Sequence, residues 1–347
     1  MEAKVVMSSV SFVVTSRNDE HGGEMLTRMR VFMESLLTLA NKYHLKGELI
    51  VVEWNPPEEK PRLWETLKVS GQSSHFPVRY IEVPASIHNS FRNSDTIPCF
   101  QMIAKNVGIR RAKCEFVVSS AIDLVLSEEL IYYLSSVSLD PKALYRINRY
   151  DVTGNIPLDL TVEERLKWCR RKENMIRLHT MTRSIILQRK YRIRDLNWRE
   201  YIMQKTLSLA YVILGILSGV IPKVHTNACG DFTMMARKCW EKLHGHPEIP
   251  IYSLHIDSIL CYMAIAMGLR QVILKKPLQI FHIEHENSWV TLSPEKKLSF
   301  FVEKPWIPLE VLKGIRRHMF KNKKPLDLND EDWGLASMDL QEHIFIS

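Results

Sequence analysis

The sequence predicts an α/β protein whose mixed sheet is flanked by helices. Short runs of apolar residues alternate with longer segments that carry apolar residues at helical spacing, which is the order of elements in α/β sheets. The apolar runs are continuous and do not alternate with polar residues, as expected of strands covered on both faces. Polar residues follow several runs directly, at the strand ends where open α/β sheets hold their ligands.

The first third of the chain contains most of the predicted sheet. Strands are expected at residues 9–15, 47–54, 78–84 and 114–120, and helices at 24–43 and 99–112. Ser127 before Glu128 and Glu129 has the form of an N-cap with an acidic first turn, so another helix begins there. Asp123 then lies just past the last of these strands, either facing a ligand in the crevice or capping a backbone N–H of the loop.

The middle of the chain differs in character. Residues 161–200 hold twelve Lys or Arg against five Asp or Glu, and residues 207–221 follow without a single charge. Fifteen residues are fewer than the roughly 20 that span a bilayer. The run is therefore expected to be a buried core helix, or else a membrane-interface element with a basic flank.

The last third returns to mixed α/β character, with a helix beginning near Asp257 and a strand in "LQIFHIEHE", before a helical and loop-like tail. We therefore expect four parts: an α/β half at 1–156, a basic and apolar helical insert at 157–222, a second α/β half at 223–290, and a C-terminal helical tail at 291–347.

Composition narrows the class of protein. The 347 residues are 46% hydrophobic and 25% charged, with a net charge of +8, which suits an anionic ligand, nucleic acid or an acidic membrane surface. The six cysteines include no C-x-x-C pair, and the first residues have the form of a strand and not of a signal peptide. Reduced thiols and a cytoplasmic location, peripheral to a membrane if the basic insert docks there, are expected.

Two polar clusters follow the first two predicted strands. Ser16, Arg17, Asn18 and Asp19 come after the first, and Glu53 and Asn55 at the end of the second. A carboxylate and an amide at a strand end suit the hydroxyls and ring edges of a nucleotide, and an arginine suits a phosphate. Ordinary turn chemistry is the alternative, since Asn and Asp favour turns.

A further cluster lies in the last third. Asp231 follows a glycine, where the backbone can approach a ligand closely, and Asp257 lies where a helix N-terminus stabilises a carboxylate or is capped by it. His282 and His285 flank the end of a strand, as metal ligands or as ordinary core and surface histidines. The sequence has no P-loop, G-x-G-x-x-G, G-x-S-x-G or H-E-x-x-H motif, which disfavours the usual nucleotide hydrolases and dehydrogenases.

The order of these features resembles the GT-A class of nucleotide-sugar glycosyltransferases, both family-2-like enzymes and those like the polypeptide N-acetylgalactosaminyltransferases. The similarity rests on the polar ends of the first two strands, on "AKNVGIRRAKCEFVVSSAIDLVLSEEL", and on "GDFTMMARKCWEKLHGHPE" followed by "HIDS". It covers residues 9–130 and 225–290, whereas 157–222 has no counterpart. Lys105 and Asn106 lie in the matching helix-plus-strand block, which implies a role in donor binding. The resemblance also implies that the half at 1–156 binds a nucleotide sugar and that the half at 223–290 is the acceptor and catalytic half.

The resemblance implies transfer of a sugar from a nucleoside diphosphate sugar, with UDP favoured, to a hydroxyl of a polysaccharide or glycolipid. A divalent metal, Mn²⁺ or Mg²⁺, would bridge the diphosphate. Asp123 corresponds to the metal-binding aspartate of the D-x-D motif, and His282 or His285 would complete the metal site. Asp257 stands where the family places the general base of an inverting reaction, and Asp231 would hold the donor or acceptor sugar.

The sequence departs from the family at Ala121, which replaces the first carboxylate of D-x-D. Losing one oxygen ligand weakens a site for Mn²⁺ or Mg²⁺. A histidine from the later strand and the diphosphate oxygens could complete the shell. Metal-independent transfer, with Arg and Lys balancing the diphosphate, is the alternative.

Two other classes of protein compete with this interpretation. Nucleotidyltransferases share a similar sheet but carry a glycine-rich basic loop after the first strand, whereas "SRNDEHGG" has its glycines late and after acidic residues. A non-catalytic basic protein could bind anionic lipid or nucleic acid through residues 161–200, where aromatic side chains lie among the arginines. A solvated basic helical face would explain the same charges, and no nucleic-acid partner is expected.

Overall fold

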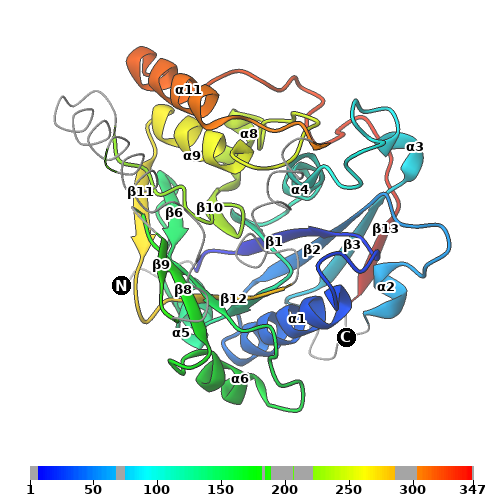
Figure 1. Cartoon of the computed structure of the whole chain (residues 1–347), viewed down its shortest axis with the longest axis vertical. Helices are drawn as coiled ribbons and strands as arrows, with labels where there is room; N and C mark the ends of the chain where they lie inside the picture. The colour runs from blue at the N-terminus through cyan, green and yellow to red at the C-terminus, as the bar shows by residue number, and fades with distance from the viewer. Residues whose placement is uncertain are drawn as a thin grey trace, which may run out of the picture.

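A large mixed sheet crosses the molecule (Figure 1). The computed structural model describes residues 7–67, 75–181, 184–188, 206, 222–285 and 303–345. The eight strands of this sheet are, in spatial order, β11 (Arg270–Leu274), β6 (Ala143–Ile147), β10 (Phe232–Ala236), β4 (Phe116–Ser120), β1 (Val10–Ser16), β2 (Gly47–Trp54), β3 (Val78–Val83) and β13 (Glu342–Phe345).

The centre of the sheet is parallel and its far parts are mixed. β1 pairs in parallel with β2 and β4, β2 pairs with β3, and β10 is antiparallel to β4 and β6. Every residue of β1 and β4 is buried, as their continuous apolar sequences predict for strands covered on both faces. The predicted α/β class with a mixed, helix-flanked sheet is confirmed.

Helices cover both sides of the sheet (Figure 1). On one side lie α4 (Gln101–Arg110), α8 (Arg237–Leu243), α9 (Ile256–Ala266) and α11 (Leu309–Asn322), and on the other lie α1 (Met25–Lys42), α5 (Glu128–Ser136) and α6 (Val162–Cys169). The short helices α2 (Leu63–Thr66) and α3 (Ala85–His88) flank β3 in the chain. The Ser127 hydroxyl accepts a hydrogen bond from the N–H of Leu130, so the predicted N-cap of α5 is confirmed.

A second sheet of five strands brings distant parts of the chain together. Its order is β5 (Leu124–Leu126), β12 (Ile280–Ile283), β7 (Arg149–Val152), β8 (Met175–His179) and β9 (Ser184–Ile186). β5 begins directly after Asp123, and His282 of β12 is the register partner of both Leu124 and Asp151. This pairing fixes Asp123 beside His282.

Two expectations for the peripheral segments need correction. The described part of 157–222 is not simply helical, because β8 and β9 follow α6 and extend the second sheet. The C-terminal segment is not only helix and loop either, since β13 pairs antiparallel with β3. Short strands that complete a distant sheet carry little local periodicity. The boundaries of the four expected parts remain predictions.

The apolar run at 207–221 lies outside the described residues. Among the residues that are described, no helix combines the length and the apolar character needed to cross a membrane.

The packing of α4 on β1 and β2 gives a test of the fold. A Cβ at Gly108 would lie 2.5 Å from Val13 Cγ1 and 3.1 Å from Val52 Cγ2. We expect Gly108→Ala to destabilise the fold by about 1–3 kcal/mol, because stiff β-branched side chains on buried strands cannot move aside. Urea unfolding measures the change.

The matched control is Gly314→Ala in α11, where an added Cβ meets no atom within 4 Å. Alanine there is expected to stabilise by about 0.5–1 kcal/mol through helix propensity alone. Changes of the same sign at both positions would contradict the packing described for α4.

Candidate active site

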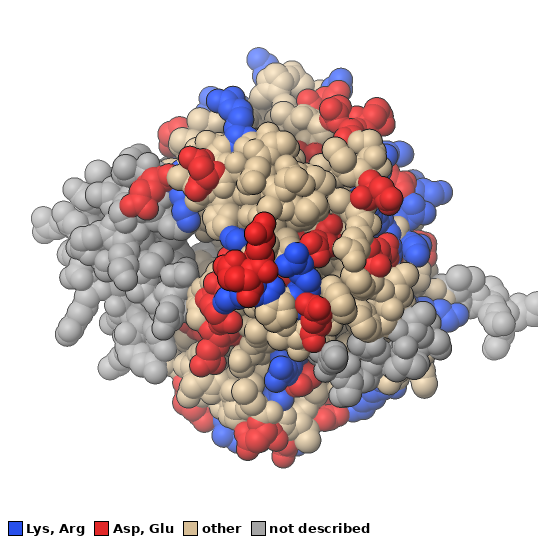
Figure 2. All heavy atoms as spheres, turned by 90° about the vertical axis from the view of Figure 1, so that its right-hand side faces the viewer, with Lys and Arg blue, Asp and Glu red and all other residues tan. Residues whose placement is uncertain are grey.

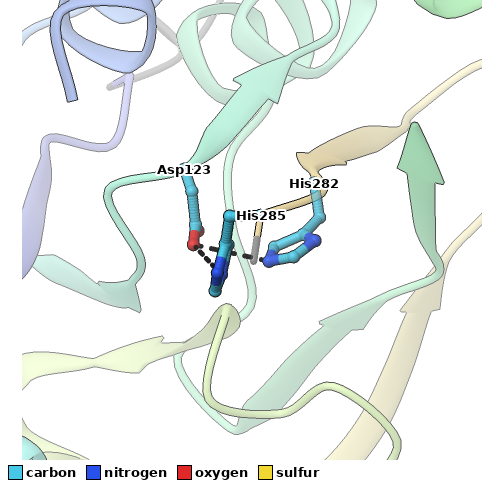
Figure 3. A group of neighbouring side chains, drawn as sticks. All are labelled: Asp123, His282 and His285. Atoms are coloured by element: carbon cyan, nitrogen blue, oxygen red, sulfur yellow. Dashed lines mark ion pairs between the residues drawn. The ribbon is translucent and has the colours of Figure 1, made fainter. Parts of the chain in front are cut away.

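Three potential metal ligands converge beyond the carboxyl end of β4. Asp123 lies between β4 and β5, His282 belongs to β12, and His285 follows two residues after that strand. Asp123 Oδ2 lies 3.4 Å from Nε2 of each histidine, and the two imidazoles point toward the carboxylate (Figure 3). One ligand atom from each side chain falls within 4.8 Å of the others. We call these three residues the triad.

The triad fits a divalent cation. It offers one carboxylate and two imidazoles, the donors that transition metals accept, and the buried Asp123 Oδ1 has no hydrogen-bond partner. Burial alone would raise the pKa of Asp123, but His282 and His285 hold it well below its usual range. The site therefore keeps an ionised carboxylate ready for a cation.

Several charged side chains pair with one another next to the triad. Asp151, which is fully buried, accepts from His179 Nε2 at 2.9 Å and faces Arg149 Nε at 2.8 Å. Arg149 Nη1 lies 2.5 Å from Asp231 Oδ2. The same Asp151 oxygen that lies against Arg149, Oδ1, also faces His282 Nδ1 at 3.7 Å. A buried carboxylate thus stands behind the ring of one candidate ligand.

Lys105 connects the other predicted carboxylates. Its side chain is fully buried, and Nζ donates to the Gly230 carbonyl at 2.6 Å. Burial lowers the pKa of Lys105, whereas the charges of Asp231, Asp257 and Asp123 raise it, and burial dominates. Three of the carboxylates that sequence reasoning singled out therefore act electrostatically on one buried ammonium.

Asp257 lies in the first turn of α9, as predicted. Its Oδ1 accepts from the backbone N–H of Ser258 at 2.7 Å. Its Oδ2 faces Gly230, where an added Cβ would lie 3.2 Å from that oxygen. A side chain at position 230 would therefore crowd this carboxylate oxygen.

A cavity of about 240 Å³ opens at the carboxyl end of β1. Ser16 and Arg17 line it from the strand end, Tyr252 and Ser253 from the segment before α9, and Lys304 from the segment before α11. Arg17 and Lys304 are the two cations of the lining and Asp19 is its one carboxylate, so the cavity suits a ligand with anionic groups.

Two residues that were predicted to contact the nucleotide sugar form hydrogen bonds within the protein. The Asn18 amide donates to the Pro61 carbonyl at 2.8 Å, and that side chain is buried. The Asn106 amide donates to the His246 carbonyl at 2.8 Å and to Glu248 at 2.9 Å. Direct donor contacts by either residue remain predictions.

Two other predicted contacts shape the wall behind the cavity. Asn55, in a left-handed conformation with φ of 49°, accepts from Arg17 Nε through its carbonyl at 2.7 Å and donates to the Pro98 carbonyl. Glu53 is 1% exposed, and its Oε2 accepts from the Leu63 N–H at 2.8 Å. Neither side chain lines the cavity, so their contacts with a nucleotide remain predictions.

Sequence reasoning missed Arg149, Asp151 and His21, and it placed Asp19 in the first polar cluster without a role of its own. Arg149 and Asp151 stand two apart in the strand "RYDV", which places both on one face of the strand. Charges at strand spacing beside buried apolar residues were the signal that could have revealed them. Asp19 and His21 follow β1 in a loop, where sequence alone gives no indication of their orientation.

Glu53 provides a test of burial through pH. Burial raises the pKa of Glu53 from 4.5 to about 7, against the hydrogen bond from Leu63. Because the pKa of Glu53 is higher in the folded state, the protonated side chain contributes to the free energy of unfolding. That contribution is complete below about pH 4.5 and is lost as the pH rises through about 7. The shift corresponds to about 3 kcal/mol.

We therefore expect Glu53→Gln to unfold like the wild type at pH 5 and to be more stable by up to about 3 kcal/mol at pH 8.5. Glu58→Gln, at an exposed position, should change little at either pH. A Glu53→Gln effect that is equal at both pH values would contradict the buried, raised carboxyl.

No protein-family model matches the sequence, and no curated protein matches it. Among solved structures, the chain is similar to GalNAc-T7, crystallised with UDP, GalNAc and Mn²⁺, at 12% identity and a TM-score of 0.47. That similarity covers 89% of this chain and 47% of the other, so this chain spans about half the length of GalNAc-T7.

A second similar structure is the mannosyltransferase PcManGT from Pyrobaculum calidifontis in complex with GDP-Man and Mn²⁺. The identity is 12% and the TM-score 0.42, with coverage of 96% of this chain and 73% of the other. Both likenesses concern the course of the chain. At this identity and TM-score, neither carries a substrate or a metal over to this protein.

Proposed function

We propose that this protein is a metal-assisted glycosyltransferase that moves a sugar from a nucleoside diphosphate sugar to an acceptor hydroxyl. The observation that carries the proposal is the convergence of Asp123, His282 and His285 at the carboxyl end of β4. The cavity with Arg17 and Lys304 opens at the end of neighbouring β1. Asp231 and Asp257 act electrostatically on the same buried ammonium, Lys105, as Asp123 does.

The cavity at β1 would hold the nucleotide. Arg17 is oriented by the carbonyl of Asn55, and together with Lys304 it would balance the charge of the diphosphate. The triad would hold a divalent cation, which when bound supplies Lewis-acid stabilisation of the leaving diphosphate. Asp123, kept ionised by its histidine partners, needs no deprotonation before it binds.

Asp257 would act as the general base, and Asp231 would orient the sugar. Asp257 has one oxygen on the helix N–H of Ser258 and the other facing Gly230, so the second oxygen can take the proton of an acceptor hydroxyl. Asp231 is ion-paired with Arg149, which fixes its carboxylate in place to orient sugar hydroxyls. A separate base on the acceptor side corresponds to an inverting transfer.

The proposed acceptor is a hydroxyl of a polysaccharide or glycolipid, and UDP is the favoured nucleotide. Both rest on the family resemblance of the sequence. Docking at a membrane through residues 157–222 remains a prediction, because its apolar part lies outside the described residues.

A basic binding protein is less well supported. Arg165 pairs with Glu34 of α1 at 2.8 Å, and Arg170 pairs with Glu129 of α5 at 2.5 Å. These arginines thus attach the described part of the insert to the core. On the face shown in Figure 2, Lys and Arg side chains lie interleaved with Asp and Glu and form no single basic patch.

The first test is nucleotide binding with and without metal. Thermal shift and calorimetry with UDP, GDP, CMP and their sugars, each with Mn²⁺, Mg²⁺ or EDTA, should reveal one nucleotide that binds with metal. The expected stabilisation is about 2–3 kcal/mol at a hundredfold excess over Kd. Asp123→Asn, which keeps the shape and removes the charge, should abolish the metal dependence.

Asp327→Asn, an exposed carboxylate on another part of the surface, is the matched control and should bind like the wild type. Equal binding in EDTA would remove the metal from the proposal and leave a transferase that balances the diphosphate with Arg and Lys. No binding of any nucleotide would overturn the proposed function.

The proposed base gives a second prediction. Asp257→Asn should lower kcat by about 10²- to 10⁴-fold, the usual contribution of general base catalysis, while the Kd for nucleotide and metal stays unchanged. Isothermal titration alongside initial rates separates the two effects. A parallel loss of binding and turnover would show that Asp257 holds the donor and does not act as the base.

A further inference from the structure

The loop after β1 has an unusual backbone. Within "DEHGGE", residues 19–24, the φ angles are 60° at Glu20, 72° at Gly22, 70° at Gly23 and 45° at Glu24. Two of these residues are not glycine, and each left-handed residue with a side chain costs about 1–2 kcal/mol. Strain of this kind persists where the surrounding structure over-determines a functional geometry.

One buried guanidinium holds the loop in this shape. Arg28, in the first turns of α1, donates from Nη2 to the His21 carbonyl at 2.9 Å and from Nη1 to the Gly22 carbonyl at 3.2 Å and the Gly23 carbonyl. α1 has no side-chain cap at Glu24. The contacts of Arg28 therefore determine the path of the chain into the helix.

The loop contacts the triad. A Cβ on Gly22 would lie 2.7 Å from His285 Nδ1 and 3.1 Å from Arg28 Nη2. The loop therefore packs directly against one of the candidate metal ligands, and glycine at position 22 is what permits the approach.

The same loop directs an imidazole into the cavity. His21 Nδ1 lies 2.5 Å from Asp19 Oδ1, whose partner oxygen lies 3.4 Å from Arg17 Nη1. All three residues line the 240 Å³ cavity, and the His21 side chain is 46% exposed. Because Asp19 engages Nδ1, the nitrogen left for a ligand is Nε2.

We propose that His21 is a catalytic residue whose Nε2–H contacts the outer phosphate of the nucleoside diphosphate sugar. This proposal rests on the proposed function. The cavity holds the nucleotide on one side of His21, and Gly22 meets the triad on the other. In its protonated form the ring has an N–H on each nitrogen, so it can donate to Asp19 and to a phosphate oxygen at once.

The proposed sugar transfer needs no reactant besides the nucleotide sugar and the acceptor. The bond between the anomeric carbon and the outer phosphate oxygen breaks, and its electron pair leaves with the diphosphate. The acceptor oxygen forms the new bond to that carbon, and its proton goes to Asp257. His21 keeps its proton and donates a charge-assisted hydrogen bond to the departing oxygen, where negative charge develops.

The test compares nucleoside diphosphates with monophosphates. Calorimetry with Mn²⁺ measures UDP, GDP, UMP and GMP binding to the wild type, His21→Gln and the control His318→Gln on the exposed face of α11. We expect His21→Gln to weaken diphosphate binding about 10- to 100-fold, as for loss of one charge-assisted hydrogen bond, and to leave monophosphate binding unchanged. A change of structure alone would lower both affinities together.

Unchanged diphosphate binding in His21→Gln, or parallel losses for diphosphate and monophosphate, would overturn the role of His21 while the proposed function stands. A wild type that binds none of the four nucleotides would instead overturn the proposed function. As a second variant, Gly22→Ala should lower Mn²⁺ affinity, measured by electron paramagnetic resonance of free Mn²⁺, because its Cβ displaces His285. Unchanged Mn²⁺ affinity would contradict the contact between loop and triad.

Discussion

The candidate active site depends on one guanidinium, that of Arg149, which is shared between two carboxylates. Asp151 on the same strand and Asp231 in the loop before β10 both lie against it. Burial would lower the pKa of Arg149, but these charges raise it overall, so the group stays ionised. Removing one member of such a network leaves an uncompensated buried charge, at about 3–5 kcal/mol.

Through these two ion pairs, Arg149 connects two clusters of candidate site residues. Asp151 is the register partner of His282 in the second sheet, while Asp231 follows Gly230, the partner of Lys105 and neighbour of Asp257. Arg149 thus ties the triad to the carboxylates proposed for sugar binding and proton transfer. The contacts of Arg28 attach the loop after β1 to α1. Gly22 of that loop in turn packs against His285 of the triad.

Sequence reasoning could reach the sheet because its strands are buried on both faces and read as continuous apolar runs. It could also reach Asp123, Asp257 and the two histidines, since each lies at the end of an element that periodicity locates. It could not reach the second sheet. β5, β8 and β9 are three to five residues long, and only pairing across the fold makes them strands. The contacts of Asn106 and Glu53 were hidden for a related reason, because a buried polar residue that supports the scaffold has the same sequence signature as one that meets a ligand.

The identity of the triad bears on the cation itself. A site with two carboxylates offers mainly oxygen, the donor that Mg²⁺ requires in near-ideal octahedral geometry. Here Ala121 removes one carboxylate, and His282 and His285 bring two nitrogens to within 3.4 Å of Asp123. Imidazole suits Mn²⁺ less well than later transition metals but far better than it suits Mg²⁺. We propose that, with a cation held by the triad, the presence of two imidazoles disfavours Mg²⁺. The buried Asp151, 3.7 Å behind His282 Nδ1, would help to hold Nε2 of that ring toward the cation. On this proposal, the departure from the D-x-D pattern changes which metal the site would accept.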